Sequence, residues 1–571
     1  MNRASARDVK IPDEGSRGDA AVLELIDARA TSFDEEPPST SPTPAHQVAR
    51  GLYALWTLGI LALFFLHFPH LLADFPNNSP WMDYSKYTDE GWYGNAAIRY
   101  YLTGHWYLHG DFNPAVALPV WPLLLAGVFH FTGVSLVAAR VLGLAFFGLN
   151  LVLAYCVVRT QAERWVALLA VTLLAASPFL WAFSRLAILE PSLICFLLLS
   201  WLLALHLRGA SVRAQRLMLV AIGLLLCLMV LTKTTAIFIV PSTLYLVARA
   251  FDLRRRSIRP LAIVAAAAAL PWCAWYILLV RPHYRVDYQY LFDANHWPQP
   301  TTFGGWLAAF WYALHGSLWI SPTLCITAVA LLLITLIPGL VDASEQTAEK
   351  NHSSRPLWQS PLTIASLLAA AGYVFFAGWH NSPQPRYYET VIYPLCFVLA
   401  LGTADLLRRS RPVLLRIGGA AAVTVLAAVS ITGVVSIATF IRHPEYTSLN
   451  AAKGVTSYID QHPGPHRLLL SISGDNIRLI TGLPAICDDY GTWDLPYRIH
   501  TYQPGWYAAW NELDPGSLVD IQTQYSLERV ADFTAFDDPD RNDLILYRMV
   551  PLPPARQNYS VQEEAAGNAG R

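Results

Sequence analysis

Long apolar stretches, separated by short polar connections, run from about residue 50 to residue 440. A helix needs about 20 mostly apolar residues to cross a hydrocarbon core of ~30 Å. Measured against that length, the pattern predicts a polytopic α-helical membrane protein. The eleven expected spans lie near residues 51–73, 136–158, 164–182, 191–207, 215–232, 235–249, 260–281, 319–340, 360–379, 389–407 and 413–440.

One further apolar segment, 115–132, is interrupted by Pro119 and Pro122. Irregular backbone at membrane depth must be covered by protein, because lipid offers its polar groups no hydrogen bonds. We therefore expect this segment to form an interfacial or re-entrant helix.

The pattern changes beyond the last expected span. Residues 446–551 alternate polar helical stretches with short apolar runs such as 468–472 and 543–547, which is typical of a small α/β domain. The first 48 residues are rich in Ser, Pro, Asp and Glu and lack an apolar run. The chain is thus expected to comprise a disordered tail (1–48), a membrane domain (49–442), the α/β domain (446–551) and a second disordered tail (552–571).

Composition agrees with this interpretation. Hydrophobic residues make up 54% of the chain and charged residues 14%, whereas soluble domains carry about 25% charged residues. The net charge of −1 indicates no nucleic-acid partner. Six of the seven cysteines lie in apolar runs, so we predict neither a disulfide framework nor a CxxC metal site.

Lysine and arginine residues are distributed unequally between the two sets of connections. The loops assigned to the cytoplasm hold 16 of these residues in 54 positions, and the outer connections hold 7 in 122. Positive charge favours the cytoplasmic side, so we expect a cytoplasmic N-terminus and an extracytoplasmic C-terminal domain. Counting 115–132 as a full span would instead place the arginines at 254–256 outside.

The outer connections carry the candidate chemistry. Asp89 and Glu90 open an amphipathic helix in the first outer loop. Carboxylates at a helix start cap free N–H groups and complement the helix dipole, which is one interpretation. The other is a general base held at the membrane surface.

Two further charged positions lie at breaks between spans. Arg185 and Glu190 form the apex of a hairpin, where they could make a local ion pair or bind a ligand. The apolar stretch 217–248 is too long for one span and is interrupted only around Lys233. Because a lysine at a span centre costs ~2.5–3.5 kcal/mol, we place Lys233 at the outer interface, where it snorkels or binds a lipid-linked phosphate.

The last candidates precede the span near 389–407. Arg386 has the planar fork that grips phosphate groups. Tyr387 and Tyr388 either bind substrate or belong to the aromatic belt of the membrane interface. Carboxylates and cations thus gather on one membrane face, and a phosphate-linked sugar needs both.

Taken in order, these residues resemble the GT-C superfamily of lipid-phosphate-dependent glycosyltransferases. The similarity is closest to the family 39 group, which holds protein O-mannosyltransferases and the bacterial lipid A aminoarabinose transferase. It covers about residues 50–440. It rests on Asp89-Glu90, Leu118-Pro119 to Leu125, Ala139-Arg140, Ser184-Arg185 with Leu189-Glu190, Lys233, and Arg386-Tyr387-Tyr388 with Pro394.

The resemblance implies a catalytic membrane domain at 49–442 and an inverting transfer at the extracytoplasmic face of the cell membrane. The donor would be a polyprenyl-phosphate monosaccharide, and the acceptor a hydroxyl of a glycolipid, polysaccharide or protein. Asp89 would deprotonate the acceptor. The other implied site residues are Glu90 and Glu190 as catalytic carboxylates, Lys233, Arg386 and Arg185 around the donor phosphate, and Tyr387 and Tyr388 as substrate contacts.

The sequence departs from its relatives in two places. Glu190 stands where many of them have Asp, and residues 113–119 lack the His-Pro-Pro found near the end of their first loop. The second difference leaves the acceptor and any metal open. No cofactor is predicted, and a divalent metal beside Asp89 and Glu90 stays an alternative.

Two other classes of protein compete with this interpretation. A transporter or flippase of lipid-linked sugars predicts charges near the bilayer midplane and repeated halves, whereas the charges here lie at one face and no repeat is evident. A non-catalytic binding subunit predicts loss of the acidic pair, which is present. The sequence therefore favours a glycosyltransferase, but it does not identify the sugar or the acceptor.

Overall fold

The computed structural model describes residues 44–76, 79–81, 89–110, 113–293, 299–336, 357–408, 413–462, 464, 466–487, 495–511, 515–536 and 542–553. The chain divides into two compact units whose boundary, Leu58, lies inside helix α2 (Pro44–Phe65). Most of each predicted tail, 1–43 and 554–571, lies outside the described residues. Helix α2 already begins within the predicted N-terminal tail.

Eight helical stretches in the described residues are long and apolar enough to cross a membrane. They contain α2, α5 (Leu136–Arg159), α8 (Glu190–His206), α9 (Val212–Thr232), α11 (Ile258–Trp275), α16 (Pro361–His380), α17 (Glu389–Arg408) and α18 (Val413–Arg442). A bent pair adds a ninth candidate, because Phe303–Trp319 and Pro322–Leu336 pass the same test together with a bend of 108°. This pair contains α14 (Phe303–Gly316) and α15 (Pro322–Leu336).

Two of the expected spans are shorter than a full crossing. The first, 164–182, is divided into α6 (Arg164–Ala175) and α7 (Pro178–Phe183), where Ser177 caps the new helix and Pro178 starts it. The second, 235–249, consists of η4 (Thr234–Phe238) and α10 (Val240–Ala250). Helix α4 (Val120–Thr132) has 13 residues and occupies the segment expected to be interfacial.

The largest difference from the predicted spans concerns the outer connection 282–318. Its end is helical, because residues 303–316 form α14, which packs against α16. Its fourteen residues are too short for a separate crossing, so periodicity alone did not distinguish this helix from a loop. The connection also contains α13 (Arg285–Asp293).

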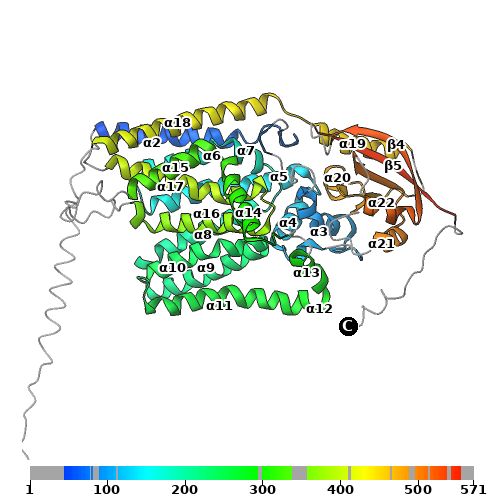
Figure 1. Cartoon of the computed structure of the whole chain (residues 1–571), viewed down its shortest axis with the longest axis horizontal. Coiled ribbons are helices and arrows are strands. Elements are labelled where there is room, and N and C mark those ends of the chain that lie inside the picture. The colour runs from blue at the N-terminus through cyan, green and yellow to red at the C-terminus, as the bar shows by residue number, and fades with distance from the viewer. Residues whose placement is uncertain are drawn as a thin grey trace, which may run out of the picture. The chain divides into compact units, whose positions relative to one another are not determined.

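Helix α17 is the centre of one group of packed helices. Helix α17 contacts α16, α18, α15 and α6, while α8 packs between α5 and α9, and α9 against α11 (Figure 1). In the span that contains α17, 89% of the residues in its most apolar stretch are buried. The start of α17 is therefore a rigid place to hold a functional side chain.

The C-terminal part contains the expected small α/β arrangement. Its five strands have the order β2-β1-β3-β5-β4; β1 pairs in parallel with β2 and β3, and β5 is antiparallel to β3 and β4. The elements are α19 (Thr447–Gln461), β1 (Leu469–Ser471), α20 (Gly474–Thr481), β2 (Ala485–Ile486), α21 (Leu495–Tyr502), β3 (Trp506–Trp510), α22 (Pro515–Gln522), β4 (Tyr525–Thr534) and β5 (Asp543–Pro551).

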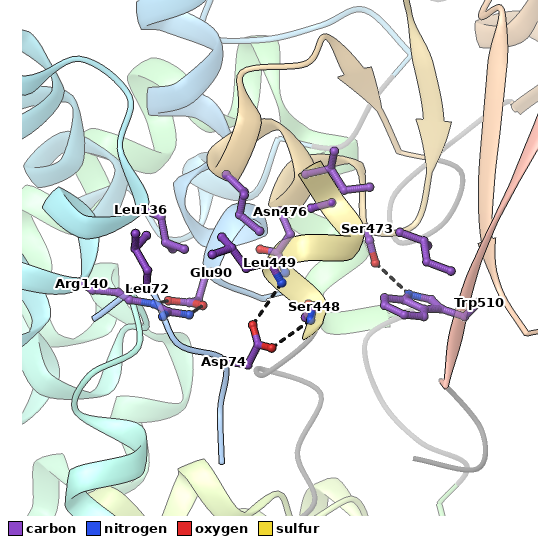
Figure 2. Close-up of a pocket in the computed structure, with 14 residues that line it drawn as sticks. Leu72, Asp74, Glu90, Leu136, Arg140, Ser448, Leu449, Ser473, Asn476 and Trp510 are labelled. Carbon is purple, nitrogen blue, oxygen red and sulfur yellow. Dashed lines mark hydrogen bonds and ion pairs between the residues drawn. The ribbon is translucent and has the colours of Figure 1, made fainter. Parts of the chain in front are cut away.

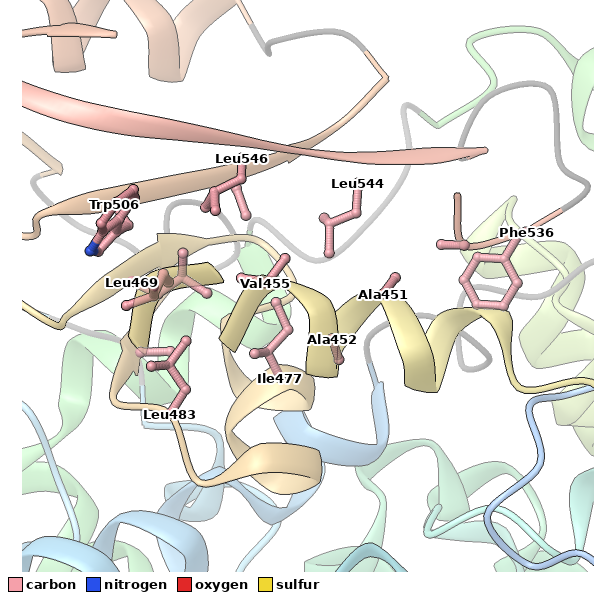
Figure 3. Packing of buried hydrophobic residues seen from close by; sticks show 14 residues of the cluster. Ala451, Ala452, Val455, Leu469, Ile477, Leu483, Trp506, Phe536, Leu544 and Leu546 are labelled. Carbon is pink, nitrogen blue, oxygen red and sulfur yellow. The ribbon is translucent and has the colours of Figure 1, made fainter. Parts of the chain in front are cut away.

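Alternate side chains of this sheet enter two different cores. Leu469, Trp506 and Leu546 pack with Val455 of α19 and Ile477 of α20 on one face (Figure 3). The neighbouring strand residues pack with α21 and α22 on the other face. The two-residue period of a strand thus lets one sheet bind helices on both sides.

Candidate functional site

The first turn of helix α3 (Asp89–Thr103) carries the acidic pair. The Asp89 carboxylate lies 2.7 Å from the Arg386 guanidinium, with side-chain exposures of 17% and 9%. Arg386 belongs to the short helix η11 (Pro385–Tyr388), which leads directly into α17. A candidate base and a candidate phosphate-binding cation are therefore in contact.

A second ion pair lies at the break between α9 and α10. Lys233 caps the C-terminus of α9 in an extended conformation, and its ammonium lies 2.5 Å from the Glu190 carboxylate. Glu190 is fully buried in the first turn of α8. Lys233 is also buried, so it does not snorkel to an open interface; its charge is compensated by a carboxylate.

Tyr387 joins the two ion pairs. The Lys233 ammonium lies 4.3 Å from the centre of the Tyr387 ring, and the Arg386 guanidinium carbon lies 5.3 Å from it. Both distances are within cation–π range. We call Lys233, Arg386 and Tyr387 the cation cluster, which has Asp89 on one side and Glu190 on the other.

Glu90 points to different partners. Its two carboxylate oxygens accept hydrogen bonds from Arg140 at 2.8 and 2.7 Å, and the Ala187 N–H donates a third at 2.8 Å. Arg140 also donates to the carbonyls of Leu71 and Ala73. Glu90 therefore ties α3 to α5 and to the connection before α8, and Arg140 extends the contact to the loop after α2.

Arg185 lies apart from the cation cluster. It donates to the carbonyls of Pro69 and His70 at 2.7 and 2.6 Å and stacks on Trp181 at 4.1 Å. It lines a cavity of about 280 Å³ beside the end of α18, whose walls include neither Lys233 nor Arg386. Burial, reinforced by the charge of Arg140, lowers the pKa of Arg185 to about 9.

Tyr388 differs from its neighbour Tyr387. Its hydroxyl donates to the carbonyl of Ala313 in α14, and its ring meets Trp319 edge to face. A side chain at Gly316 would overlap this hydroxyl, so α14 and Tyr388 pack closely. The structure thus places Tyr387 at the cation cluster and Tyr388 in the packing against α14.

The arrangement can be compared with known proteins. Residues 114–276 match the family model of dolichyl-phosphate-mannose-protein mannosyltransferases. The crystal structure of ArnT from Cupriavidus metallidurans bound to undecaprenyl phosphate is similar, with a TM-score of 0.58 at 15% identity over 87% of this chain and 98% of that chain. Its apo form gives 0.55 at 14% identity over 88% and 98%. The chain has the GT-C fold. No curated protein matches the sequence.

The GT-C fold confirms the polytopic helical architecture with its small C-terminal α/β unit, and with it the resemblance predicted from the sequence. The family match covers the region from η2 (Pro114–Val116) to α11, which contains Arg140, Arg185, Glu190 and Lys233. The structural likeness thus shows the fold of a multi-pass membrane protein, and the family match adds a sequence similarity over residues 114–276.

Sequence reasoning did not assign a role to Arg140, which the structure shows to be the main partner of Glu90. A signal was present, because a charged residue within an apolar span is costly and needs a partner. Asn476 in the C-terminal part was missed as well. Its side chain accepts a hydrogen bond from the Gly91 N–H at 2.6 Å, and no local pattern in the sequence indicated this contact.

A small cavity of about 30 Å³ lies between the membrane domain and the C-terminal part (Figure 2). Glu90 and Arg140 line it from the membrane domain, and Asn476 and Trp510 from the C-terminal part. The volume suits about one water molecule. This cavity can therefore hold solvent, but it is too small for a sugar.

The described residues do not fit a resident metal beside the acidic pair. Both oxygens of Glu90 accept from Arg140, and Asp89 is paired with Arg386. Within the described ranges, no group of three or more His, Cys, Asp or Glu side chains is arranged to hold a metal ion.

Proposed function

We propose that this chain transfers a monosaccharide from a polyprenyl-phosphate donor to an acceptor hydroxyl at the extracytoplasmic face of the membrane, with inversion at the anomeric carbon. The observation that carries the proposal is the contact of Asp89 with Arg386 beside Lys233 and Tyr387. One small site thereby combines a carboxylate with two cations.

Asp89 is the proposed base. It is the more exposed partner of its ion pair, at 17%, so an acceptor hydroxyl can approach it. Asp89 would accept the hydroxyl proton while the acceptor oxygen attacks the anomeric carbon from the face opposite the phosphate. The bond between that carbon and the phosphate oxygen breaks, and its electron pair leaves with the phosphate.

Lys233 and Arg386 are the proposed phosphate-binding cations. An ammonium has three donors and a guanidinium five, so each can hold its carboxylate and a phosphate oxygen together. The phosphate gains charge as the glycosidic bond breaks, and fixed cations stabilise that change more than they stabilise the bound donor. No nucleotide or covalent enzyme intermediate is needed, because a phosphate is already a competent leaving group.

The two buried glutamates have positioning roles in this mechanism. Glu190 would hold the Lys233 ammonium beside the Tyr387 ring. Glu90 would fix the first turn of α3 through Arg140 and the Ala187 N–H. Tyr387 would orient the two cations through its ring face, and Tyr388 would secure η11 against α14.

The distribution of charge supports an extracytoplasmic site. Asp89, Lys233 and Arg386 all lie at connections that the positive-inside rule assigns to the outer face. The donor lipid would place its phosphate at the same interface. The family match of residues 114–276 supports a lipid-linked donor, because the name of that family specifies dolichyl-phosphate-mannose.

The proposal can be tested by transfer assays on the purified chain and its Asp89→Asn variant. A panel of radiolabelled polyprenyl-phosphate hexoses and pentoses serves as donor, with membrane extract as the source of acceptors. We expect sugar transfer by the parental chain and a loss of roughly 10²–10⁴-fold in kcat for Asp89→Asn, the usual contribution of a positioned base.

Asn retains the size of Asp and its capacity to cap a helix, so the variant should remain folded and inserted. An Asp89→Asn variant that transfers sugar at the parental rate would contradict the proposed mechanism. Absence of transfer from every donor in the panel, by a folded parental chain, would contradict the proposed function.

A further inference from the structure

The C-terminal α/β part lies directly against the helix that carries Asp89. Helix α20 contacts α3, and the sheet and its other helices lie beyond it (Figure 1). The first residues of α20 contact α3 at its first turn and again at Arg99. The contact therefore lies close to the proposed base, although the C-terminal part contributes no residue to the cation cluster.

The contact begins at the Gly91 amide. The first four N–H groups of an α-helix have no carbonyl partner within the helix. In α3 the Gly91 N–H, two residues after Asp89, donates to the Asn476 side-chain oxygen at 2.6 Å. Asn476 thus caps the first turn of α3 from a distant part of the sequence.

Gly91 is required for this approach. A Cβ atom at position 91 would lie 2.3 Å from the carbonyl carbon of Asp475 and 2.4 Å from the Asn476 nitrogen. These are backbone atoms, so they could move only if the start of α20 moved. The absence of a side chain at Gly91 therefore lets the two backbones meet.

A second contact fixes the rotation of α3. The Arg99 guanidinium lies 3.8 Å from the Asp475 carboxylate, and both side chains are at least 96% buried. Arg99 is eight residues beyond Gly91, slightly more than two helical turns. Two contacts separated along one helix prevent it from turning about its axis or sliding.

The opposite side of the same turn is held by the membrane domain. Glu90 is bound by Arg140 and the Ala187 N–H, and Asp89 contacts Arg386. The first turn of α3 is therefore enclosed between two parts of the chain. If α20 withdrew, the Gly91 N–H would lose its acceptor and Asp89 would lose one of its two supports.

We propose that the C-terminal part is a positioning element of the active site, in which Asn476 and the α20 backbone hold the first turn of α3 so that Asp89 faces the acceptor. The proposal rests on the proposed function for its catalytic consequence. The support of α3 by Asn476 can be measured separately, without an activity assay.

The test uses the full chain with two replacements of nearly equal shape. Asn476→Leu removes the hydrogen-bond acceptor, and Asn476→Asp keeps it. Val519→Ala, at a 64% exposed position of α22, is the control for a change in the same part of the chain. We expect Asn476→Leu to lower kcat by roughly 10- to 100-fold, the cost of a reacting group misplaced by about 1 Å, with little change in donor KM. Asn476→Asp should restore most of kcat.

Hydrogen exchange provides the readout independent of activity. In Asn476→Leu, peptides covering the first turn of α3 should exchange roughly tenfold faster, and those covering β1 and β3 should not change. Gly91→Ala changes the same contact on the α3 side, and it should also speed exchange in the first turn of α3. This variant provides the test if Asn476→Leu disturbs the sheet.

Parental protection of α3 in both Asn476→Leu and Gly91→Ala would overturn the proposal, whatever the activity. Faster exchange with a parental kcat would overturn its catalytic part. If the parental chain transferred no sugar, the proposed function would fail, while the exchange measurement would still decide whether Asn476 supports α3.

Discussion

The Asp89 carboxylate and the Arg386 guanidinium lie 2.7 Å apart, although they come from the two ends of the membrane domain. In the mechanism proposed here, the base and a phosphate-binding cation neutralise each other before the donor binds. A phosphate that joins Arg386 would share this cation and leave the carboxylate better able to accept a proton. Donor binding would thus prepare the base.

This relationship predicts the kinetics of Arg386 variants. Arg386→Ala should raise the donor KM and lower kcat, each by at least about tenfold, because both the bound phosphate and the departing one lose a partner. Arg386→Lys should recover only part of this loss, since lysine lacks the planar fork. Initial rates over a range of donor concentrations, with folding checked by gel filtration, distinguish these outcomes. Parental kinetics for Arg386→Ala would remove Arg386 from the donor site.

Arg185 should behave differently from Arg386. It holds the carbonyls of Pro69 and His70 and lines a separate cavity, so Arg185→Met should leave the donor KM nearly unchanged. The same variant should lower the midpoint of thermal unfolding, because two buried carbonyls lose their donor. A rise in donor KM equal to that of Arg386→Ala would return Arg185 to the donor phosphate, where sequence reasoning placed it.

The neighbouring carboxylates Asp89 and Glu90 show what sequence could and could not predict. Their position in an outer loop and the family resemblance marked both as functional. Their partners could not be predicted, because consecutive helical residues project about 100° apart and meet different elements. Asp89 reaches Arg386, whereas Glu90 reaches Arg140.

The same limit applies to Arg185 and Glu190. Their proximity in one hairpin suggested a local ion pair, yet Glu190 pairs with Lys233 and Arg185 with backbone carbonyls. The break at Lys233 was predictable, since a lysine inside an uninterrupted span is costly. Which carboxylate would compensate its charge depends on how α8 and α9 pack, and that arrangement has no signature in local spacing.

Glu90 and Arg140 form a buried pair, which predicts a large effect on stability. Glu90→Gln leaves the Arg140 guanidinium buried without its counter-charge, and breaking such a pair costs about 3–5 kcal/mol. We therefore expect a marked loss of folded protein in thermal unfolding monitored by gel filtration. The double variant Glu90→Gln, Arg140→Met should recover part of it, because no unpaired charge remains. If the double variant were less stable than Glu90→Gln, the hydrogen bonds of Arg140 to the Leu71 and Ala73 carbonyls would outweigh the cost of its unpaired charge.

The proposed extracytoplasmic site predicts the accessibility of single cysteines. His105 and Val519 are exposed and should lie on the outer face, and Arg255 is exposed in a connection assigned to the cytoplasm. In intact cells, an impermeant thiol reagent should label His105→Cys and Val519→Cys but not Arg255→Cys. Permeabilised cells provide the control, since all three positions should then react. Labelling of Arg255→Cys alone in intact cells would reverse the topology.

Asp74 predicts how stability depends on pH. Its carboxylate accepts hydrogen bonds from the Ser448 and Leu449 N–H groups at 2.9 and 3.2 Å, at the start of α19 (Figure 2). Burial raises the pKa of Asp74 from 3.8 to about 6, because the hydrogen bonds and the charge of Arg140 only partly offset desolvation. The folded chain therefore binds more protons than the unfolded chain between these two values.

Stability should consequently fall as pH rises from about 4 to 6, and this contribution should be constant above pH 7. Asp74→Asn keeps an oxygen acceptor for α19 but cannot titrate, so its unfolding midpoint should change less over the same interval. The informative quantity is the difference in unfolding midpoint between parent and variant at each pH, because all other titrating groups contribute equally to both. Equal pH dependence in both would mean that Asp74 titrates at its ordinary pKa in the folded chain.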